Sequence, residues 1–404
     1  MSSDVVELER AADRLLDDWR EVAVAEVVTM LPGFAFKSEN FVTDTDAGLP
    51  LIRIRDLGLT NTATRYVGDY DEAFAVRDGD ILVGMDGAFE AVRWQGGKAL
   101  LNQRVLKLSS ARPDAIDEGY LFYRVQPALS ELEQTISGTT VKHLSTKDLK
   151  RLVWKLPPLD EQRRIAEVLR SVDEAIAAQS AVCSHLRQAT DDLADELYAC
   201  EIAECADSLT AYGDACETVQ VGIVVKPASY YVDDGGVPAL RSTNIRRNQI
   251  EFLALVQLSH EGHEFNRKSS LRAGDVVTIR TGEPGKTAVI PHDAPSPLNC
   301  IDIIFSRPKP HLRPHFAAYF INSSTARRQI LGAQGGLAQQ HFNVGEMKKL
   351  KLPVPDLARQ DRLIEVLDAA WQSVRVEEAQ LAALQSTKAG LMPSILSGRV
   401  RVPT

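Results

Sequence analysis

The chain has 404 residues, of which 44% are hydrophobic and 25% are charged, so we expect two or three globular domains with buried cores. It contains no run of 18 apolar residues, and its acidic beginning lacks the basic and apolar regions of a signal peptide, so neither a membrane span nor export is expected. The five cysteines include no Cys-x-x-Cys pair, which argues against a disulfide framework or a metal site and favours a cytoplasmic protein.

The net charge of −9 is distributed unevenly along the chain. Residues 156–211 carry 4 Lys and Arg against 12 Asp and Glu, whereas residues 212–351 carry 17 against 12. The acidic excess therefore belongs mainly to one stretch, which is predicted below to be helical. The second globular stretch is basic, which permits contact with phosphate but does not demand it.

A long internal repeat organises the sequence. Gly138–Leu152 resembles Gly336–Leu350, with matched residues 198 positions apart, and the same offset relates Gln162 to Gln360. We therefore predict that one unit, a globular domain followed by a long helix, is used twice. The predicted segments are an N-terminal helix (1–19), a first globular domain (20–155), a long helix (156–206), a second globular domain (207–351) and a second long helix (352–404).

Each globular domain is predicted to be mixed α/β. Short β-like runs, broken by Gly, Asp, Asn and Pro, occur at Leu51–Ile54, Ile81–Gly84, Val276–Ile279 and Ile301–Phe305. A helix is predicted over Gly119–Leu132 in the first domain, and its counterpart in the second domain is predicted over His315–Leu331.

Asp160–Cys200 is predicted to be one long helix, because mostly apolar residues alternate at spacings of four and three. This seam comprises Ile165, Leu169, Val172, Ile176, Gln179, Cys183, Leu186, Thr190, Leu193, Leu197 and Cys200. The second copy keeps it at Leu363, Leu367, Ala370, Val374, Glu377, Leu381, Leu384, Lys388, Leu391 and Ile395, although Gly390 and Pro393 weaken the last turns.

Two helices with narrow apolar stripes in one chain should pair with each other. The predicted fold class is α+β, with two similar α/β domains separated by an antiparallel two-helix coiled coil. From periodicity alone, an ordinary helical hairpin inside a larger scaffold stays open as an alternative.

Three stretches carry a resemblance to a known family. LPPLDEQRRIAEVL at 156–169, KAGLMPSILSGRVRV at 388–402 and the opening residues Trp19–Phe41 resemble segments of the specificity subunits of type I restriction-modification systems. The resemblance covers about residues 19–404, and the first two motifs are fairly specific together. The second copy departs from the pattern, because Arg359 stands where a Glu precedes the Gln in the first copy.

The resemblance implies that each globular domain is a target-recognition domain that reads one half of a bipartite site in double-stranded DNA. The helices would set the spacing and dock two modification subunits, which carry S-adenosylmethionine and methylate adenine. Restriction subunits would add the translocase and nuclease that use ATP and Mg. By this resemblance the chain itself holds no catalytic site, cofactor or metal.

Loops of both domains supply the side chains that DNA readers use for phosphates and base edges. The predicted contacts in the first domain are Arg53, Arg55, Lys98, Asn102, Gln103, Arg104, Thr139, Thr140, Lys142 and His143. Those in the second are Arg241, Asn244, Arg246, Arg247, Arg280, Lys286, Gln339, Gln340 and His341. Solvated loops with a structural histidine are the alternative interpretation, and Arg53 and Arg55 lie on a predicted strand where one of them can simply face solvent.

The sequence shows no familiar catalytic constellation. Gly282–Thr287 superficially resembles a phosphate-binding loop, but it lacks the spacing of that motif. No HExxH, GxSxG or Asn-Pro-Pro-Tyr/Phe motif occurs. Two alternatives stay open: an unrecognised nuclease or methyltransferase, and a helical-hairpin scaffold protein without DNA binding.

Overall fold

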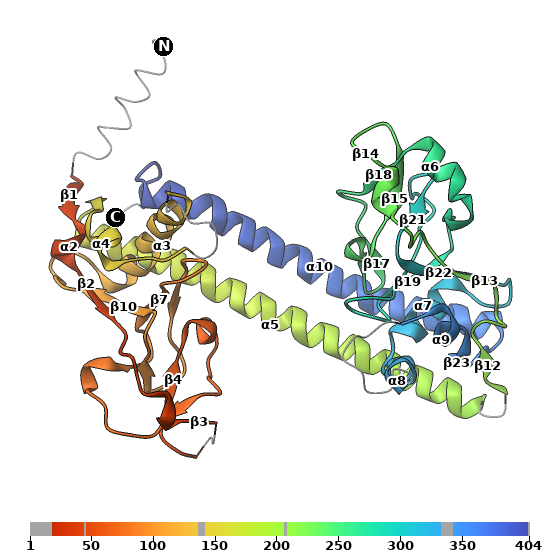
Figure 1. Cartoon of the computed structure of the whole chain (residues 1–404), viewed down its shortest axis with the longest axis horizontal. Coiled ribbons are helices and arrows are strands. Elements are labelled where there is room, and N and C mark those ends of the chain that lie inside the picture. The colour runs from red at the N-terminus through yellow and green to blue at the C-terminus, as the bar shows by residue number, and fades with distance from the viewer. Residues whose placement is uncertain (1–17, 44–45, 136–141, 206–207, 333–341, 403–404) are drawn as a thin grey trace, which may run out of the picture. The chain divides into compact units, whose positions relative to one another are not determined.

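The computed structural model describes residues 18–43, 46–135, 142–205, 208–332 and 342–402. The chain forms two units, of which the first is Met1–Ala178 with Leu381–Thr404 and the second is Gln179–Gln380. Each unit has one α/β domain and a part of both long helices (Figure 1). The helix predicted over residues 1–19 lies almost wholly outside the described residues, and the finer segment boundaries stay a prediction.

A four-stranded antiparallel sheet of order β2–β10–β7–β8 is the centre of the first domain. Ile81 and Val83 of β7 lie in one apolar cluster with α3, whereas Leu82 between them lies in a second cluster with Trp94 and Leu101. Side chains alternate along a strand, so this sheet buries both faces. The elements are β2 (Val28–Pro32), β7 (Ile81–Gly84), β8 (Ala91–Arg93), β10 (Val105–Ser110) and α3 (Glu118–Thr135).

A second sheet of order β3–β5–β4–β9–β6 lies against that second cluster, and in it β4 and β9 run parallel. Its strands are β3 (Phe41–Val42), β4 (Leu49–Ile52), β5 (Arg65–Tyr66), β6 (Ala75–Val76) and β9 (Ala99–Leu101). A strand pair joins the start of the domain to its end. It consists of β1 (Arg20–Ala23) and β11 (Val153–Leu156), flanked by the short helices α2 (Val24–Val27) and α4 (Thr146–Lys150).

The second domain repeats this plan within its own unit. Its central antiparallel sheet has the order β13–β22–β19–β20, and its second sheet again contains a parallel pair, β15 with β21. The central strands are β13 (Cys216–Val221), β19 (Val276–Ile279), β20 (Thr287–Val289) and β22 (Ile303–Pro308). The second sheet comprises β14 (Tyr231–Val232), β15 (Val237–Leu240), β18 (Val256–Leu258) and β21 (Asn299–Cys300).

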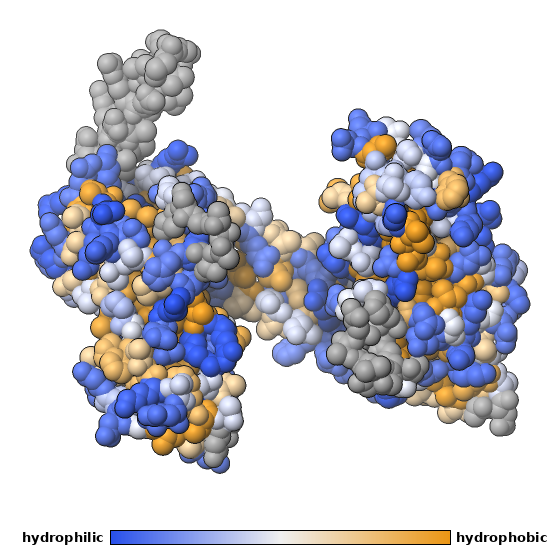
Figure 2. All heavy atoms as spheres, in the orientation of Figure 1, coloured by the Kyte–Doolittle hydropathy of each residue, from blue (hydrophilic) through white to orange (hydrophobic). Residues whose placement is uncertain are grey.

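The remaining elements of this unit complete the repeat. The pair β12 (Thr210–Ala211) with β23 (Lys351–Leu352) corresponds to β1 with β11, and α9 (Val344–Lys349) corresponds to α4. A hairpin of β16 (Ile245–Arg246) and β17 (Gln249–Ile250) and the helix α6 (His260–Phe265) belong to this domain. Hydrophilic side chains cover most of the visible face of each unit, with smaller apolar patches among them (Figure 2).

The helix predicted over His315–Leu331 is wrong as a single helix. The chain instead forms α7 (Pro314–Asn322) and α8 (Ser324–Gly332), with Ser323 extended between them at ψ 159°. The Oγ of Ser323 accepts a hydrogen bond from the amide of Ala326, so this side chain caps the second helix. The first domain keeps one continuous α3 although Pro127 lies inside it.

The long helices are α5 (Leu159–Glu204) and α10 (Leu357–Leu396), and α10 continues through Gly390 and Pro393. In the first unit Asp173 forms an ion pair with Lys388 at 2.5 Å, and in the second unit Gln179 and Arg187 bind Glu377 and Glu378. Glu161 pairs with Arg401 in the first unit, and Glu201 pairs with Arg359 in the second. Within each unit, rising numbers on α5 thus meet falling numbers on α10, so the helices are antiparallel. The predicted fold class, two similar α/β domains with an antiparallel coiled coil, is confirmed.

The seam positions from Ile165 to Leu197 on α5, and all those on α10, are buried or half-buried. The assignment of Cys200 to the seam is wrong, because its side chain is exposed. Near this end Tyr198 turns inward instead: its hydroxyl donates to the carbonyl of Phe316 at 2.6 Å, and its ring packs edge-on against Phe316 and Phe320. None of the described helices is long and apolar enough to cross a membrane.

Candidate nucleic-acid interface

Three loops of the first domain meet where β7 ends. They are residues 85–87, the turn 102–104 between β9 and β10, and residues 142–144. Backbone hydrogen bonds join them: the amide of Met85 donates to Arg104 at 3.0 Å, that of Gly87 to Lys142 at 3.1 Å, and that of Leu144 to Met85 at 2.7 Å. Residues 136–141, which include the predicted contacts Thr139 and Thr140, adjoin this site but lie outside the described residues.

Asp86 is the electrostatic centre of this loop cluster. Its carboxylate binds the guanidinium of Arg104 at 2.5 Å and Nδ1 of His143 at 2.7 Å. The Asp86 side chain is only 16% exposed, whereas Arg104 and His143 are 62% and 57% exposed. Partial burial alone would raise the pKa of Asp86, but the hydrogen bonds from Arg104 and His143 outweigh it and hold that pKa below its usual value.

The same three loops meet in the second domain. Here the amide of Phe342 donates to the carbonyl of Arg280 at 2.9 Å, just as Leu144 binds Met85, and the guanidinium of Arg280 binds Asp302 at 2.9 Å. Arg104 and Asp302 occupy matching turn positions with left-handed φ values of 67° and 49°. The charges are therefore reversed, because the turn carries the cation in the first domain and the carboxylate in the second.

A cavity of about 210 Å³ lies beside the second loop cluster. The loop Gly282–Lys286 forms one wall, and Arg247, Asn322 and Arg327 contribute polar groups to the others. Two of its cations already have partners, since Lys286 pairs with Glu283 at 2.5 Å and Arg247 pairs with Asp191. A phosphate bound here would have to compete with these carboxylates.

Several predicted contacts instead stabilise a turn after the parallel strand of each domain. The end of the strand predicted at Leu51–Ile54 is wrong: residues 54–56 form a 3-10 turn, in which the Arg53 guanidinium binds Asp56 at 3.3 Å. The matching turn in the second domain has the amide of Arg241 donating to Oδ1 of Asn244 at 3.0 Å. Arg55 is exposed beside this turn.

The other predicted residues have varied surroundings. Lys98 pairs with Glu72 and lies 5.3 Å from the ring centre of Tyr70, and Arg246 pairs with Glu251 at 3.1 Å. Asn102 is buried and Gln103 is exposed on the turn of the first loop cluster, while the amine of Lys142 donates to the carbonyl of Glu133. Gln339, Gln340 and His341 lie outside the described residues. As DNA contacts, all these residues stay a prediction.

The sequence reasoning missed two residues, Asp86 and Asp302, which organise the two loop clusters. Carboxylates are not among the side chains expected to bind phosphates or most base edges. The repeat could have found one of them, since the offset of 198 that relates Gln162 to Gln360 also places Asp302 opposite Arg104. Among the described residues, no group of three or more His, Cys, Asp or Glu could hold a metal ion.

Two like α/β domains, each with three convergent loops and a share of an antiparallel helix pair, define a class of tandem recognition protein. A family model of the type I restriction modification DNA specificity domain matches residues 16–182 and 226–386. The chain therefore belongs to this family, the specificity subunits of type I restriction-modification systems, whose role is the recognition of DNA sequence.

Individual relatives agree with this assignment. The chain is 27% identical to the Escherichia coli type I restriction enzyme EcoBI specificity subunit, over 95% of this chain and 86% of that one. It is 22% identical to the MjaVIII specificity subunit of Methanocaldococcus jannaschii, over 96% and 94% of the two chains. The crystal structure of the S subunit from M. genitalium shares its fold, with a TM-score of 0.55, 15% identity, and coverage of 96% and 97%.

Proposed function

We propose that each α/β domain reads one half of a bipartite site in double-stranded DNA, through its three-loop cluster and the glycine-containing segments 137–143 and 335–341. The observation that supports this most directly is that both domains assemble the same three loops but give them opposite charge arrangements. A shared scaffold with different surface chemistry suits two readers of different half-sites, since base edges are distinguished by the donors and acceptors presented to them.

We further propose that the chain assembles with modification and restriction subunits. The paired helices set the length of the unread spacer and dock two modification subunits, which supply S-adenosylmethionine and methylate adenine. Restriction subunits join this complex with ATP and Mg. The chain itself works in the cytoplasm as a non-catalytic subunit. The name of the family and of the EcoBI relative supports an assembly of this kind.

A domain exchange tests the reading function. Residues 20–155 are replaced by the equivalent domain of another specificity subunit, the chain is expressed with its modification subunits, and adenine methylation is profiled across a genome. One half of the methylated site should change while the other half and the spacer length persist. If both halves changed together, the modular proposal would be wrong. Methylation that does not depend on this chain at all would favour the helical-hairpin scaffold.

Lengthening the helices tests the spacer. One heptad inserted next to Gln179 and another next to Glu377 keep the seam in phase, and each adds roughly 10 Å of helix at 1.5 Å per residue. The methylated site should then tolerate a spacer longer by up to about three base pairs at 3.4 Å each. A matched control inserts one heptad into α5 only, which puts the two seams out of register and should abolish methylation.

A further inference from the structure

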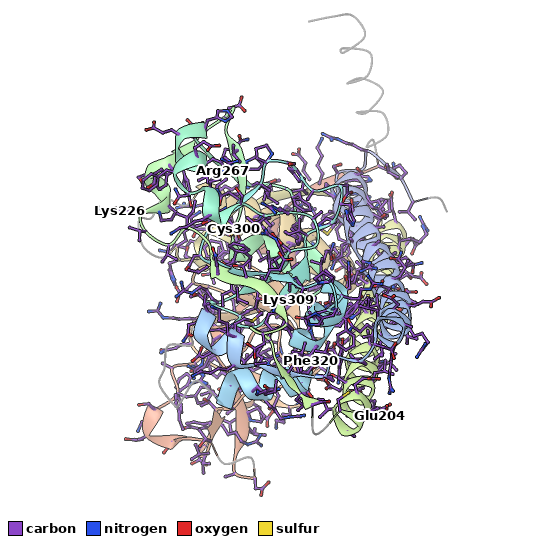
Figure 3. All side chains as sticks on the ribbon, turned by 90° about the vertical axis from the view of Figure 1, so that its right-hand side faces the viewer. Glu204, Lys226, Arg267, Cys300, Lys309 and Phe320 are labelled. Atoms are coloured by element: carbon purple, nitrogen blue, oxygen red, sulfur yellow. The ribbon has the colours of Figure 1, made fainter. Side chains whose placement is uncertain are left out.

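The ends of the helix pair carry ion pairs, each with one buried glutamate, whose polarity is reversed between the two units. In the first unit Glu161, at the start of α5, is 4% exposed and receives the guanidinium of Arg401 at 2.6 and 2.7 Å. In the second unit Arg359, at the start of α10, binds Glu201 at 2.7 Å and also Glu204. Glu204 lies at the end of α5 (Figure 3).

These residues occupy matching places in the repeat. Residue 161 of the first copy corresponds to 359 of the second at the offset of 198, so a helix starts with an acid in one copy and with a base in the other. The distal ends also differ in sign, because the first copy ends with Glu201 and Glu204 and the second with Arg399 and Arg401. At the offset of 198 Glu201 corresponds to Arg399, whereas Arg401, which binds Glu161, corresponds to Ala203. The reversal at the distal ends therefore accompanies the reversal at the helix starts, so each start meets an opposite charge.

Matching residues of the two copies also differ in charge at the middle of the helix pair. Gln179 and Glu377 are equivalent residues of the two copies, and they contact each other, as they must where an antiparallel pair of repeats crosses its own axis. The Gln179 amide donates to the Glu377 carboxylate at 2.6 Å. A pair of equivalent residues would be identical if the helices were interchangeable, and here one is neutral and the other is anionic.

A second copy of this chain could in principle exchange helices, so that α5 pairs with α5 and α10 with α10. In that arrangement Glu161 would face Glu201 and Glu204 of the other chain, without the arginines that bind them within one chain, while Arg359 would face Arg399 and Arg401. The side chains of Glu161 and Glu201 are only 4% exposed, so water would screen their repulsion weakly, whereas Glu204 is 56% exposed. Two Glu377 residues would also meet.

We propose that these end pairs form a pairing code that commits α5 to α10 of the same chain and excludes helix exchange with a second copy. The apolar seam cannot supply this selectivity, because both helices bury similar aliphatic residues at the same spacing. Opposite charges at matching positions select the partner, as flanking charges do in other coiled coils. The inference does not depend on the DNA that the protein reads.

The first part of the test compares the thermal stability of full-length variants in which the charges of the end pairs are changed. Arg359→Glu places three carboxylates together and should lower the Tm by roughly 5 °C, since the buried Glu201 loses its partner and gains a like charge. Adding Glu201→Arg and Glu204→Arg restores opposite charges and should recover most of that loss. Arg362→Glu makes the same change on the exposed side of α10 and should shift the Tm little. Equal losses for Arg359→Glu and Arg362→Glu, or no recovery, would overturn the proposal.

The second arm measures exchange directly. The compensated variant with Glu377→Gln added has Glu at both helix starts and Arg at both distal ends, so each helix suits a copy of itself. Two differently tagged full-length chains are unfolded together, refolded at high concentration and tested for co-purification, against a control mixed after folding. Wild type should give no more tag exchange than that control, and the variant should give at least tenfold more. Equal exchange by both would contradict the code.

A second variant changes the ion pair of the first unit, so that the test does not depend on the folding of the first variant. Glu161→Arg with Arg399→Glu, Arg401→Glu, Asp18→Asn and Glu377→Gln gives both helix starts a base and both distal ends an acid. Asp18 is included because it also binds Arg401, at 2.9 Å. This chain should exchange tags as the first variant does. If it folds and shows only the wild-type level of exchange, the charges do not select the partner.

Discussion

The two units repeat their internal hydrogen bonds far more faithfully than the signs of their charged side chains. Gln162 in the first unit accepts from the amide of Asp117 and donates to the carbonyls of residues 115 and 157, all at 2.9 Å. Gln360 in the second unit makes the same three bonds at 2.8–2.9 Å, to Arg313 and residues 311 and 355. Likewise the amide side chains of Gln126 and Asn322 bind the backbone at the matching strand residues 91 and 287.

The charged side chains, in contrast, differ in sign between the two units. The loop clusters place Asp86 with Arg104 in one domain and Arg280 with Asp302 in the other, and the helix starts differ in the sign of residues 161 and 359. A buried amide that satisfies backbone groups cannot change without leaving those groups unpaired, which is costly. Exposed loop charges contribute little to stability, so they can change when recognition changes. The buried amides therefore stabilise each domain, whereas the exposed loop charges are free to vary with the target that is recognised.

Replacement of the buried glutamine in either unit should have the strongest effect on the unfolding free energy. Gln162→Leu leaves one amide and two carbonyls unpaired in a site where this side chain is 1% exposed, so we expect a loss of about 3 kcal/mol in the unfolding free energy of the first unit. Gln360→Leu should cost the second unit a similar amount. Denaturant unfolding followed by hydrogen exchange of each unit measures both. Gln188→Leu on the exposed side of α5 is the control, and a large difference between the two buried sites would break the comparison.

The two ion pairs at the ends of the helix pair should differ by a smaller amount in their contribution to the unfolding free energy. Both oxygens of Glu161 are bound by Arg401, whereas in Glu201 only Oε1 is bound and Oε2 has no partner. Glu161→Gln should therefore cost about 2 kcal/mol, and Glu201→Gln about 1 kcal/mol. Thermal unfolding of the two variants in low and high salt gives the comparison. Equal costs would show that the unpaired oxygen is solvated in solution.

The loop clusters should respond to loss of their carboxylates. Asp86→Asn frees Arg104 and His143 from their partner, and we expect roughly tenfold tighter binding of nonspecific duplex by the assembled complex, with the salt dependence steeper by about one phosphate contact. Asp302→Asn should act in the same direction through Arg280. Titrations of labelled duplex at several salt concentrations measure this. Asp69→Asn, at an exposed position of the first domain, controls for net charge; an equal gain from it would rule out a local effect.

The smallest effect is expected at one aromatic position of the cores. The hydroxyl of Tyr120 is buried in α3 without a hydrogen-bond partner, and Phe316 occupies the matching place in α7. Burial raises the pKa of Tyr120 well above its usual value, in agreement with an unsolvated hydroxyl. Tyr120→Phe should therefore be neutral or stabilise the first unit by up to about 1 kcal/mol. The reciprocal Phe316→Tyr should destabilise the second unit, and a stabilising effect there would contradict this reading of the cores.

By itself the sequence determined the duplication, the two long helices with their seams, and the family. These features depend on periodicity and on matched spacing, which are local or repeated properties of the chain. The β-runs at Ile81–Gly84 and Val276–Ile279 were also predicted with the right bounds, since apolar runs between turn residues identify buried strands.

The places where the polar side chains act became clear from the folded chain alone. Arg53 and Asn244 hold turns, Asp86 and Asp302 centre the loop clusters, and Tyr198 replaces Cys200 at the end of the seam. The two turns depend on partners only three residues away but on a backbone conformation that the strand prediction did not include. The loop clusters and Tyr198 depend on partners 18 or more residues away, which spacing along the sequence does not encode. The break between α7 and α8 directly follows Asn322, whose side chain binds strand β20, whereas Gln126 makes the matching bond from the uninterrupted α3.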